Sequence, residues 1–193
     1  MLVGYDANNV MRNSAELGDF CRALVEKLAQ RHVSDYRALL FSTRIKSAYR
    51  TYFTSFANVS TFVPSGSATL MPSAWMRYSL GPSLQLEKVK VFHGLNEELP
   101  YRIGLNVRTI VTFYGMEHNK TSLLDSLVWK RRMEYSLRVA DVVVAVSEDV
   151  KRQIVETGVP EQKVVVIGTG NPYELTDQMV EQYFDLYRKL SRD

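Results

Sequence analysis

The sequence contains a single cysteine, Cys21, and no apolar run long enough to cross a bilayer. One cysteine excludes an intrachain disulfide, and with three histidines in support it makes a zinc cluster implausible. A spanning helix needs roughly 18 consecutive apolar residues, which the chain does not contain. Residues 1–6 carry neither a basic nor a long apolar segment, so they predict no signal peptide. These absences predict a soluble, cytoplasmic protein.

Acidic residues are missing from residues 36–86, although the whole chain carries a net charge of only +3. The stretch holds five basic and nine aromatic residues. Such a surface suits an anionic lipid headgroup, with the protein peripheral at the inner face of the cytoplasmic membrane, or a phosphorylated acceptor. A core with a few solvated arginines is the commoner explanation. The small net charge gives no reason to expect nucleic acid as a partner.

Short β-branched runs alternate with amphipathic helical periods along the chain. Residues 142–146 and 164–167 are continuous apolar runs, which is typical of strands buried on both faces. Further strands are expected at 2–5, 38–41, 60–63, 89–93 and 107–113, and helices at 17–31, 73–80, 123–139, 147–157 and 176–190. The alternation predicts an α/β fold, a Rossmann-like three-layer α/β/α domain with a mostly parallel sheet.

Ligands bind such sheets at the carboxyl ends of the strands, near a topological switch point. The polar loops that follow expected strands include residues 6–13, 93–100 and 114–120. His93, at the end of a strand, is a candidate to bind a hydroxyl or a phosphate, and a structural role is equally open. Glu117, His118 and Lys120 suit acid–base or phosphate chemistry, or form a solvated turn. No G-x-G-x-x-G motif is present, so the dinucleotide fingerprint is lacking.

The first of these loops leads into a helix whose N-terminus is a place for a phosphate, because its first backbone N–H groups are free. Gly18 lies in that first turn. It serves either the approach of a phosphate or the close packing of the helix. Cys21 falls on the apolar side of the helix, so we expect no nucleophilic role for it.

Four segments in order resemble the amino-terminal domain of retaining, GT-B-fold glycosyltransferases of the large bacterial family-four group. The similar segments are GYDA at 4–7 with LGDF at 17–20, VFHGLNEELP at 91–100, RTIVTFYG at 108–115, and ADVVVAVSE at 140–148 followed by KR at 151–152. Their family counterparts are G-[YF]-D-A with T-G-L-G-N-Y, V-Y-H-G-L-x-x-E-L-P, K-T-I-V-T-I-H-D, and A-D-x-I-I-A-V-S-E-x-x-K-R. The resemblance covers residues 1–171.

The resemblance implies two Rossmann-like domains that face a cleft, the first binding the acceptor and the second holding most of a nucleotide sugar such as a UDP- or GDP-hexose. Residues 1–171 correspond to the first domain and residues 172–193 to the family's last helix, which returns to pack on it. The donor-binding domain is expected to be absent. The implied reaction is hexose transfer to a saccharide or lipid-linked acceptor, with the isolated chain inactive and with neither a metal nor another cofactor.

The resemblance also implies roles for particular residues. His93 is expected to contact acceptor or sugar, and Glu148 to stand at a helix N-terminus that faces the cleft. Tyr114 replaces a histidine that contacts the transferred sugar in the family, and His118 lies four positions further on. We take His93, Tyr114 and His118 as the catalytic candidates.

Glu16, Leu17 and Gly18 correspond to the family's loop near the donor phosphates. Glu16 replaces the first glycine of that loop, and its carboxylate is expected to repel a phosphate. Together with Glu148, these residues are the candidates for donor binding.

Two other functions stay open. One is a non-catalytic binding module or subunit that needs a partner chain. The other is a flavodoxin-like phosphate-binding domain, against which the match at residues 92–100 argues. A half-enzyme is also expected to expose its cleft face and to self-associate through it.

Overall fold

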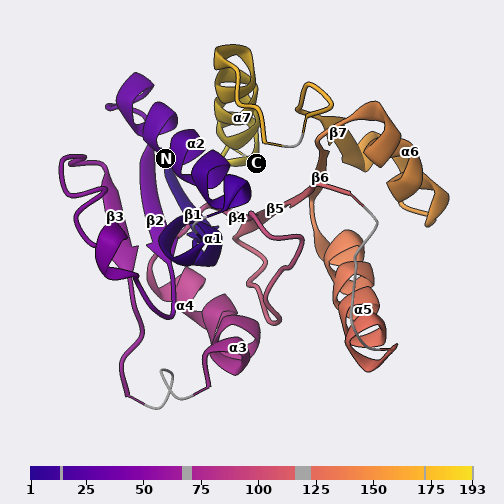
Figure 1. The fold of residues 1–193 in the computed structure, drawn as a ribbon, viewed down its shortest axis with the longest axis horizontal. Coiled ribbons are helices and arrows are strands. Elements are labelled where there is room, and N and C mark those ends of the chain that lie inside the picture. The colour runs from indigo at the N-terminus through magenta and orange to yellow at the C-terminus, as the bar shows by residue number, and fades with distance from the viewer. Residues whose placement is uncertain (14, 67–70, 116–122, 172, 193) are drawn as a thin grey trace.

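The computed structural model describes every residue except 14, 67–70, 116–122, 172 and 193 (Figure 1). An all-parallel sheet runs through the described molecule in the order β3-β2-β1-β4-β5-β6-β7. The strands are β1 (Leu2–Asp6), β2 (Arg37–Phe41), β3 (Val59–Phe62), β4 (Val91–Gly94), β5 (Arg108–Phe113), β6 (Val142–Ala145) and β7 (Val164–Val166). The predicted Rossmann-like fold with a parallel sheet is confirmed.

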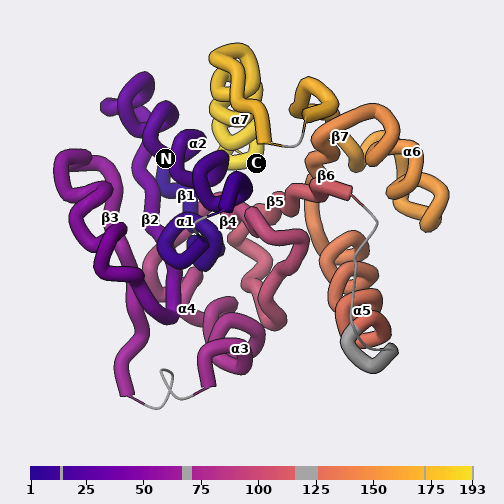
Figure 2. Tube along the Cα trace, in the orientation of Figure 1, coloured from indigo at the N-terminus to yellow at the C-terminus, as the bar shows by residue number. Residues whose placement is uncertain are grey.

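Helices cover both faces of this sheet (Figures 1 and 2). They are α1 (Asn8–Arg12), α2 (Glu16–Arg31), α3 (Pro72–Ala74), α4 (Leu80–Leu86), α5 (Leu123–Val139), α6 (Glu148–Glu156) and α7 (Asp177–Leu190). Successive strand residues point to opposite faces, so each strand contributes to two apolar clusters. One cluster packs the sheet against α1, α2 and α7, and the other packs it against α4, α5 and α6.

The strand order reverses between β1 and β4. From β1 the chain moves outward through β2 to β3, and it then crosses back to form β4 on the other side of β1. All strands are parallel, so the carboxyl ends of β1 and β4 lie next to each other, and Asp6 is in register with Gly94. The connections that leave these two ends diverge, which is the condition for a crevice.

The stretch 73–80 differs from its prediction. In place of one helix that ends at Leu80, the chain forms α3, the π-helical turn η3 (Trp75–Ser79) and then α4. Gly81 and Pro82 lie within α4, which continues η3 without an intervening loop. Gly81 is required there because a Cβ would lie 2.3 Å from the Tyr101 carbonyl oxygen.

Four of the nine aromatic residues of 36–86 are buried, and three more are partly buried against the core. Tyr36, Phe41, Phe53 and Trp75 are the buried ones, while Tyr52 is 39% and Tyr78 is 52% exposed. The composition of this stretch therefore reflects the packing of β2 and the helices near β3 more than a continuous aromatic surface. In the part of the chain that is described, no helix has the length and apolar character needed to span a membrane.

Helix α7 packs back on the domain beside α2, as predicted for the last helix. Thr176 caps it by accepting the Met179 N–H at 3.3 Å. Tyr187 projects into the core, where its hydroxyl lies 2.8 Å from Nδ1 of His93 on β4. Nε2 of the same imidazole lies 2.7 Å from the Thr112 hydroxyl on β5. All three side chains are fully buried, so this chain of hydrogen bonds ties α7 to the sheet.

We predict that Tyr187→Phe destabilises the fold by about 1–3 kcal/mol, because it leaves a buried imidazole nitrogen without a partner. Urea unfolding measures the loss. Tyr173→Phe, on an exposed tyrosine, is the matched control and is expected to be neutral. Equal stability of Tyr187→Phe and the wild type would contradict the role of the Tyr187–His93 hydrogen bond in holding α7 on the sheet.

Candidate functional site

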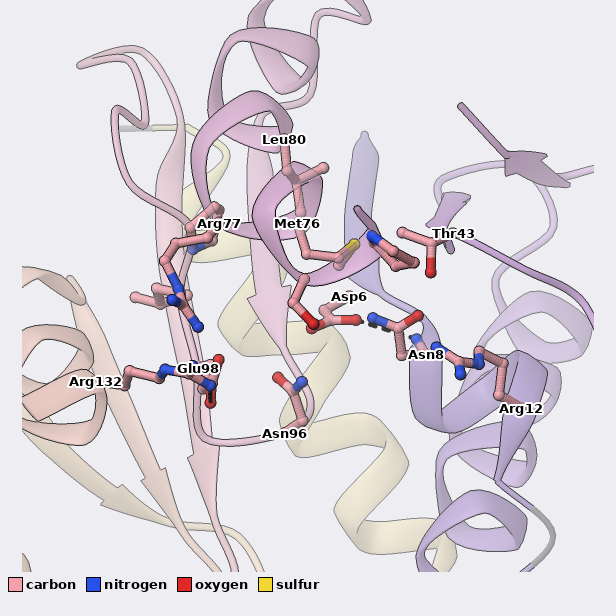
Figure 3. Close-up of a pocket in the computed structure, with 14 residues that line it drawn as sticks. Asp6, Asn8, Arg12, Thr43, Met76, Arg77, Leu80, Asn96, Glu98 and Arg132 are labelled. Carbon is pink, nitrogen blue, oxygen red and sulfur yellow. Dashed lines mark hydrogen bonds and ion pairs between the residues drawn. The ribbon is translucent and has the colours of Figure 1, made fainter. Parts of the chain in front are cut away.

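A polar pocket of about 180 Å³ lies at the carboxyl ends of β1 and β4 (Figure 3). Its walls come from the ends of β1, β2 and β4 and from α1, α3, η3, α4 and α5. The lining residues are Asp6, Asn8, Arg12, Thr43, Pro72, Ser73, Met76, Arg77, Leu80, Asn96, Glu98, Leu99, Pro100 and Arg132. The pocket therefore occupies the switch point at which parallel sheets bind ligands.

Asp6 stands at the centre of this pocket, at the last position of β1. Its Oδ1 accepts the backbone N–H of Asn8 at 3.1 Å, and the Asn96 side chain donates to it as well. Burial raises the pKa of Asp6 to about 6, with a smaller contribution from the charge of Glu98, against the lowering effect of these hydrogen bonds. The carboxylate is thus held in place, largely desolvated, and ionised at neutral pH.

Several buried polar atoms around Asp6 have no hydrogen-bond partner among the described residues. They are Oγ1 of Thr43, Oδ1 of Asn96 and Nε of Arg132, and each belongs to a residue that lines the pocket. A buried polar atom without a partner costs about 1–3 kcal/mol, so native structures rarely leave one unexplained. Three such residues around one cavity mark a polar site at which water or a polar ligand completes their hydrogen bonds.

The lining suits a small hydroxylated molecule. Asp6 and the oxygen of Asn96 accept hydrogen bonds from hydroxyls, and the asparagine amides and the arginines donate to hydroxyl oxygens. The described residues contain no cluster of histidine, cysteine or carboxylate side chains that is arranged to hold a metal.

His93 does not line the pocket. Its ring is fully buried, and both nitrogens are engaged with Tyr187 and Thr112. Burial lowers its pKa to about 3, so the imidazole is neutral at physiological pH. His93 therefore has a structural role, because its hydrogen bonds to Tyr187 and Thr112 hold α7 on the sheet. Contact of His93 with acceptor or sugar stays a prediction.

Tyr114 lies at the end of β5, where it is partly buried between that strand and α2. Its hydroxyl is 4.0 Å from Sγ of Cys21, and its backbone N–H donates to Oε1 of Glu97 at 3.2 Å. Burial raises the pKa of Tyr114 well above its usual value. Tyr114 therefore keeps its proton and packs outside the pocket lining. His118, the third catalytic candidate, is outside the described residues.

Glu16, Leu17 and Gly18 form the first turn of α2, and none of them lines the polar pocket. Glu16 is exposed, and Gly18 is buried with its N–H bonded to the Ala15 carbonyl oxygen at 2.8 Å. A Cβ at Gly18 would lie 2.2 Å from the Asn13 carbonyl oxygen. This glycine thus allows the loop before α2 to cross the helix closely, and no phosphate is needed to explain it.

Glu148 is exposed at the first position of α6, which Ser147 caps. It stands on the carboxyl side of the sheet and outside the polar pocket. Its predicted role in donor binding stays a prediction.

Sequence reasoning missed Asp6, Thr43, Arg77 and Asn96 as individual site residues. Asp6 and Asn96 lie in loops that follow expected strands, and their position at a strand end is the feature that could have identified them. Arg77 and Thr43 carry no such signal, because their place depends on how η3 and the end of β2 fold over the neighbouring strands.

The fold and the site together define a Rossmann-like domain with a polar ligand pocket at its switch point. Residues 20–172 match the sequence profile of Glycosyltransferase Family 4. The match spans more than half of the chain, and the protein belongs to this family. The predicted resemblance is confirmed. Comparison with curated proteins yields no match.

Solved structures of similar fold include a glycosyltransferase and two proteins solved with UDP-glucose or UDP. A glycosyltransferase from Rickettsia africae superposes with a TM-score of 0.51 at 16% identity, over 97% of this chain and 49% of the other. Anabaena HepE in complex with UDP-glucose gives 0.55 at 12% identity, over 96% and 50%. Staphylococcus aureus MnaA with UDP gives 0.51 at 14% identity, over 92% and 47%. This chain thus spans about half the length of these proteins.

We predict that Gly18→Ala destabilises the fold by about 1–3 kcal/mol, because the added methyl group overlaps the Asn13 carbonyl oxygen. Thermal or urea unfolding measures this loss. Glu16→Ala, on an exposed residue of the same turn, is expected to stay within about 0.5 kcal/mol of wild type. Unchanged stability of Gly18→Ala would contradict the close approach of the loop at Asn13 to the helix at Gly18.

Asp6 makes stability depend on pH. Its pKa in the folded state, about 6, is above the usual 3.8, so the folded state binds the proton more tightly. Stability attributable to this group therefore falls as the pH rises from about 4 to 6 and is constant above. The difference between the folded-state pKa and the usual pKa of Asp6 corresponds to roughly 3 kcal/mol of unfolding free energy.

Asp6→Asn keeps an oxygen for the Asn8 N–H and removes the charge. We predict that the unfolding free energy of Asp6→Asn, relative to that of the wild type, increases by roughly 3 kcal/mol as the pH rises from about 4 to 6. Urea unfolding at a series of pH values measures it. A stability difference that is the same at pH 4 and pH 7 would contradict the raised pKa.

Proposed function

We propose that this chain is the acceptor-side part of a glycosyltransferase that moves a hexose from a nucleotide sugar to a saccharide or lipid-linked acceptor. Membership of Glycosyltransferase Family 4 supports the reaction class. The observation that carries the proposal is the polar pocket at the switch point, in which Asp6 and Asn96 offer oriented hydrogen-bonding atoms to hydroxyl groups.

The donor is proposed to bind mainly outside these residues. The lining of the pocket contains no aromatic side chain for a base to stack on, and its volume of about 180 Å³ suits one sugar ring more than a nucleotide sugar. The chain also spans about half of the solved proteins that it resembles, one of which was solved with UDP-glucose. Hexose transfer is accordingly expected to need a donor-binding part, and this chain alone is expected to be inactive.

Saturation-transfer difference NMR tests this division, because it reports which part of a weakly bound molecule touches the protein. The probes are glucose, mannose, N-acetylglucosamine and UDP-glucose. We predict saturation of the sugar protons and little saturation of the uridine protons. Asn96→Ala is expected to abolish the sugar signal, because it removes the side chain that faces the hydroxyls.

Asn106→Ala is the matched control, since Asn106 is exposed and lies before β5, outside the pocket. Its signal is expected to equal that of the wild type. Strong saturation of the uridine protons would place donor binding within these residues and overturn the proposal. So would sugar signals that are insensitive to Asn96→Ala.

A further inference from the structure

The arginines of the polar pocket outnumber its carboxylates. Arg12 comes from α1, Arg77 from η3 and Arg132 from α5, whereas the acidic residues are Asp6 and Glu98. One pair is matched, because Nη1 of Arg132 lies 3.2 Å from Oε1 of Glu98. The pocket therefore holds more positive charge than its own carboxylates neutralise.

Arg77 makes neither an ion pair nor a side-chain hydrogen bond with the described residues, although it is half-buried. Charged groups that lose water are normally paired, because desolvation of an isolated charge is costly. Its backbone is fixed, since its carbonyl oxygen accepts the Tyr101 N–H at 2.7 Å. Arg77 belongs to a π-helical turn, a feature that is frequent at functional sites.

A second arginine of the pocket, Arg132, has a donor without a partner. Nε of Arg132 is buried without a hydrogen-bond partner, so its pairing with Glu98 leaves a donor unused. Arg12 is exposed, so water solvates its guanidinium. Figure 3 places Arg77 and Arg132 on one side of the pocket and Arg12 on the other, with Asp6, Asn8 and Asn96 between them.

We propose that the ligand of this pocket is a phosphorylated sugar, with its phosphate on Arg77 and Arg132 and its hydroxyls toward Asp6 and Asn96. Guanidinium groups bind phosphate oxygens through paired N–H donors, which suits the unused donors of both arginines. Asp6 disfavours a phosphate at the centre of the pocket and favours hydroxyl donors there. The inference rests on the proposed acceptor role and specifies the chemical class of the acceptor.

Isothermal titration with glucose 6-phosphate, glucose, glucuronic acid and inorganic phosphate tests this inference. We expect glucose 6-phosphate to bind at least about tenfold more tightly than any other probe, because charge-assisted hydrogen bonds add to those of the ring. Arg77→Ala is expected to remove this advantage, so that glucose 6-phosphate binds the variant no more tightly than glucose does. Arg77→Lys is expected to restore part of it, since lysine keeps the charge without the paired donors.

Arg152→Ala is the control for net charge, because Arg152 is 73% exposed on α6. It is expected to leave every affinity unchanged. Glucose 6-phosphate affinity that equals that of glucose, or that is insensitive to Arg77→Ala, overturns the inference while acceptor binding stands. Failure of every sugar to bind overturns both this inference and the proposed function.

The same phosphate chemistry has two sources, a soluble sugar phosphate and a lipid-borne one. Co-sedimentation with phosphatidylcholine vesicles that contain phosphatidylglycerol separates them. Vesicle binding that Arg77→Ala abolishes indicates that the phosphate belongs to a lipid, and absence of vesicle binding beside tight glucose 6-phosphate binding indicates a soluble ligand. Vesicle binding that survives Arg77→Ala, with no tight binding of glucose 6-phosphate, contradicts the inference.

Discussion

β1 and β4 are neighbours in the sheet, but their connections leave toward opposite edges, so the same helix does not cover both carboxyl ends. The polar residues at these ends consequently line a pocket that apolar packing does not fill. The other features of the site depend on this reversal. Arg77 reaches the pocket because the crossover from β3 to β4 carries η3 over it, and Asp6 is its centre because β1 ends there.

The pocket costs stability that the rest of the domain supplies. A desolvated carboxylate, a half-buried arginine and unpartnered polar atoms are each unfavourable in a folded chain. Two apolar clusters on the faces of the sheet offset them, and the buried chain of Thr112, His93 and Tyr187 holds α7 over one of these clusters. Sites where local stability is given up in this way are characteristic of binding function.

Most of the fold could be predicted from the sequence, because buried parallel strands have a clear pattern. The runs at 142–146 and 164–167 became β6 and β7 with their ends within a residue or so. The short helix α1 and the π-helical turn were not predicted, since neither has an apolar period long enough to detect.

The site was predictable as a region but not as a set of side chains. Position at strand ends identified the loops that hold Asp6 and Asn96, whereas Arg77 and Arg132 enter from helices distant in sequence. His93 is the opposite case, a residue that its position predicted to be functional and that the structure places in the core. Its place at the end of β4 predicted ligand contact, but the ring points into the core, where Tyr187 from α7 meets it. Only tertiary packing decides between these two environments.

We expect the ligand to bind at the switch point between β1 and β4. Amide chemical-shift mapping of the isotope-labelled chain during a glucose 6-phosphate titration tests it most directly. We predict the largest shifts at residues 6–8, 76–77 and 94–98, and little change at residues 16–18 or 148. Shifts centred on the first turns of α2 and α6, with the switch point unchanged, would contradict it.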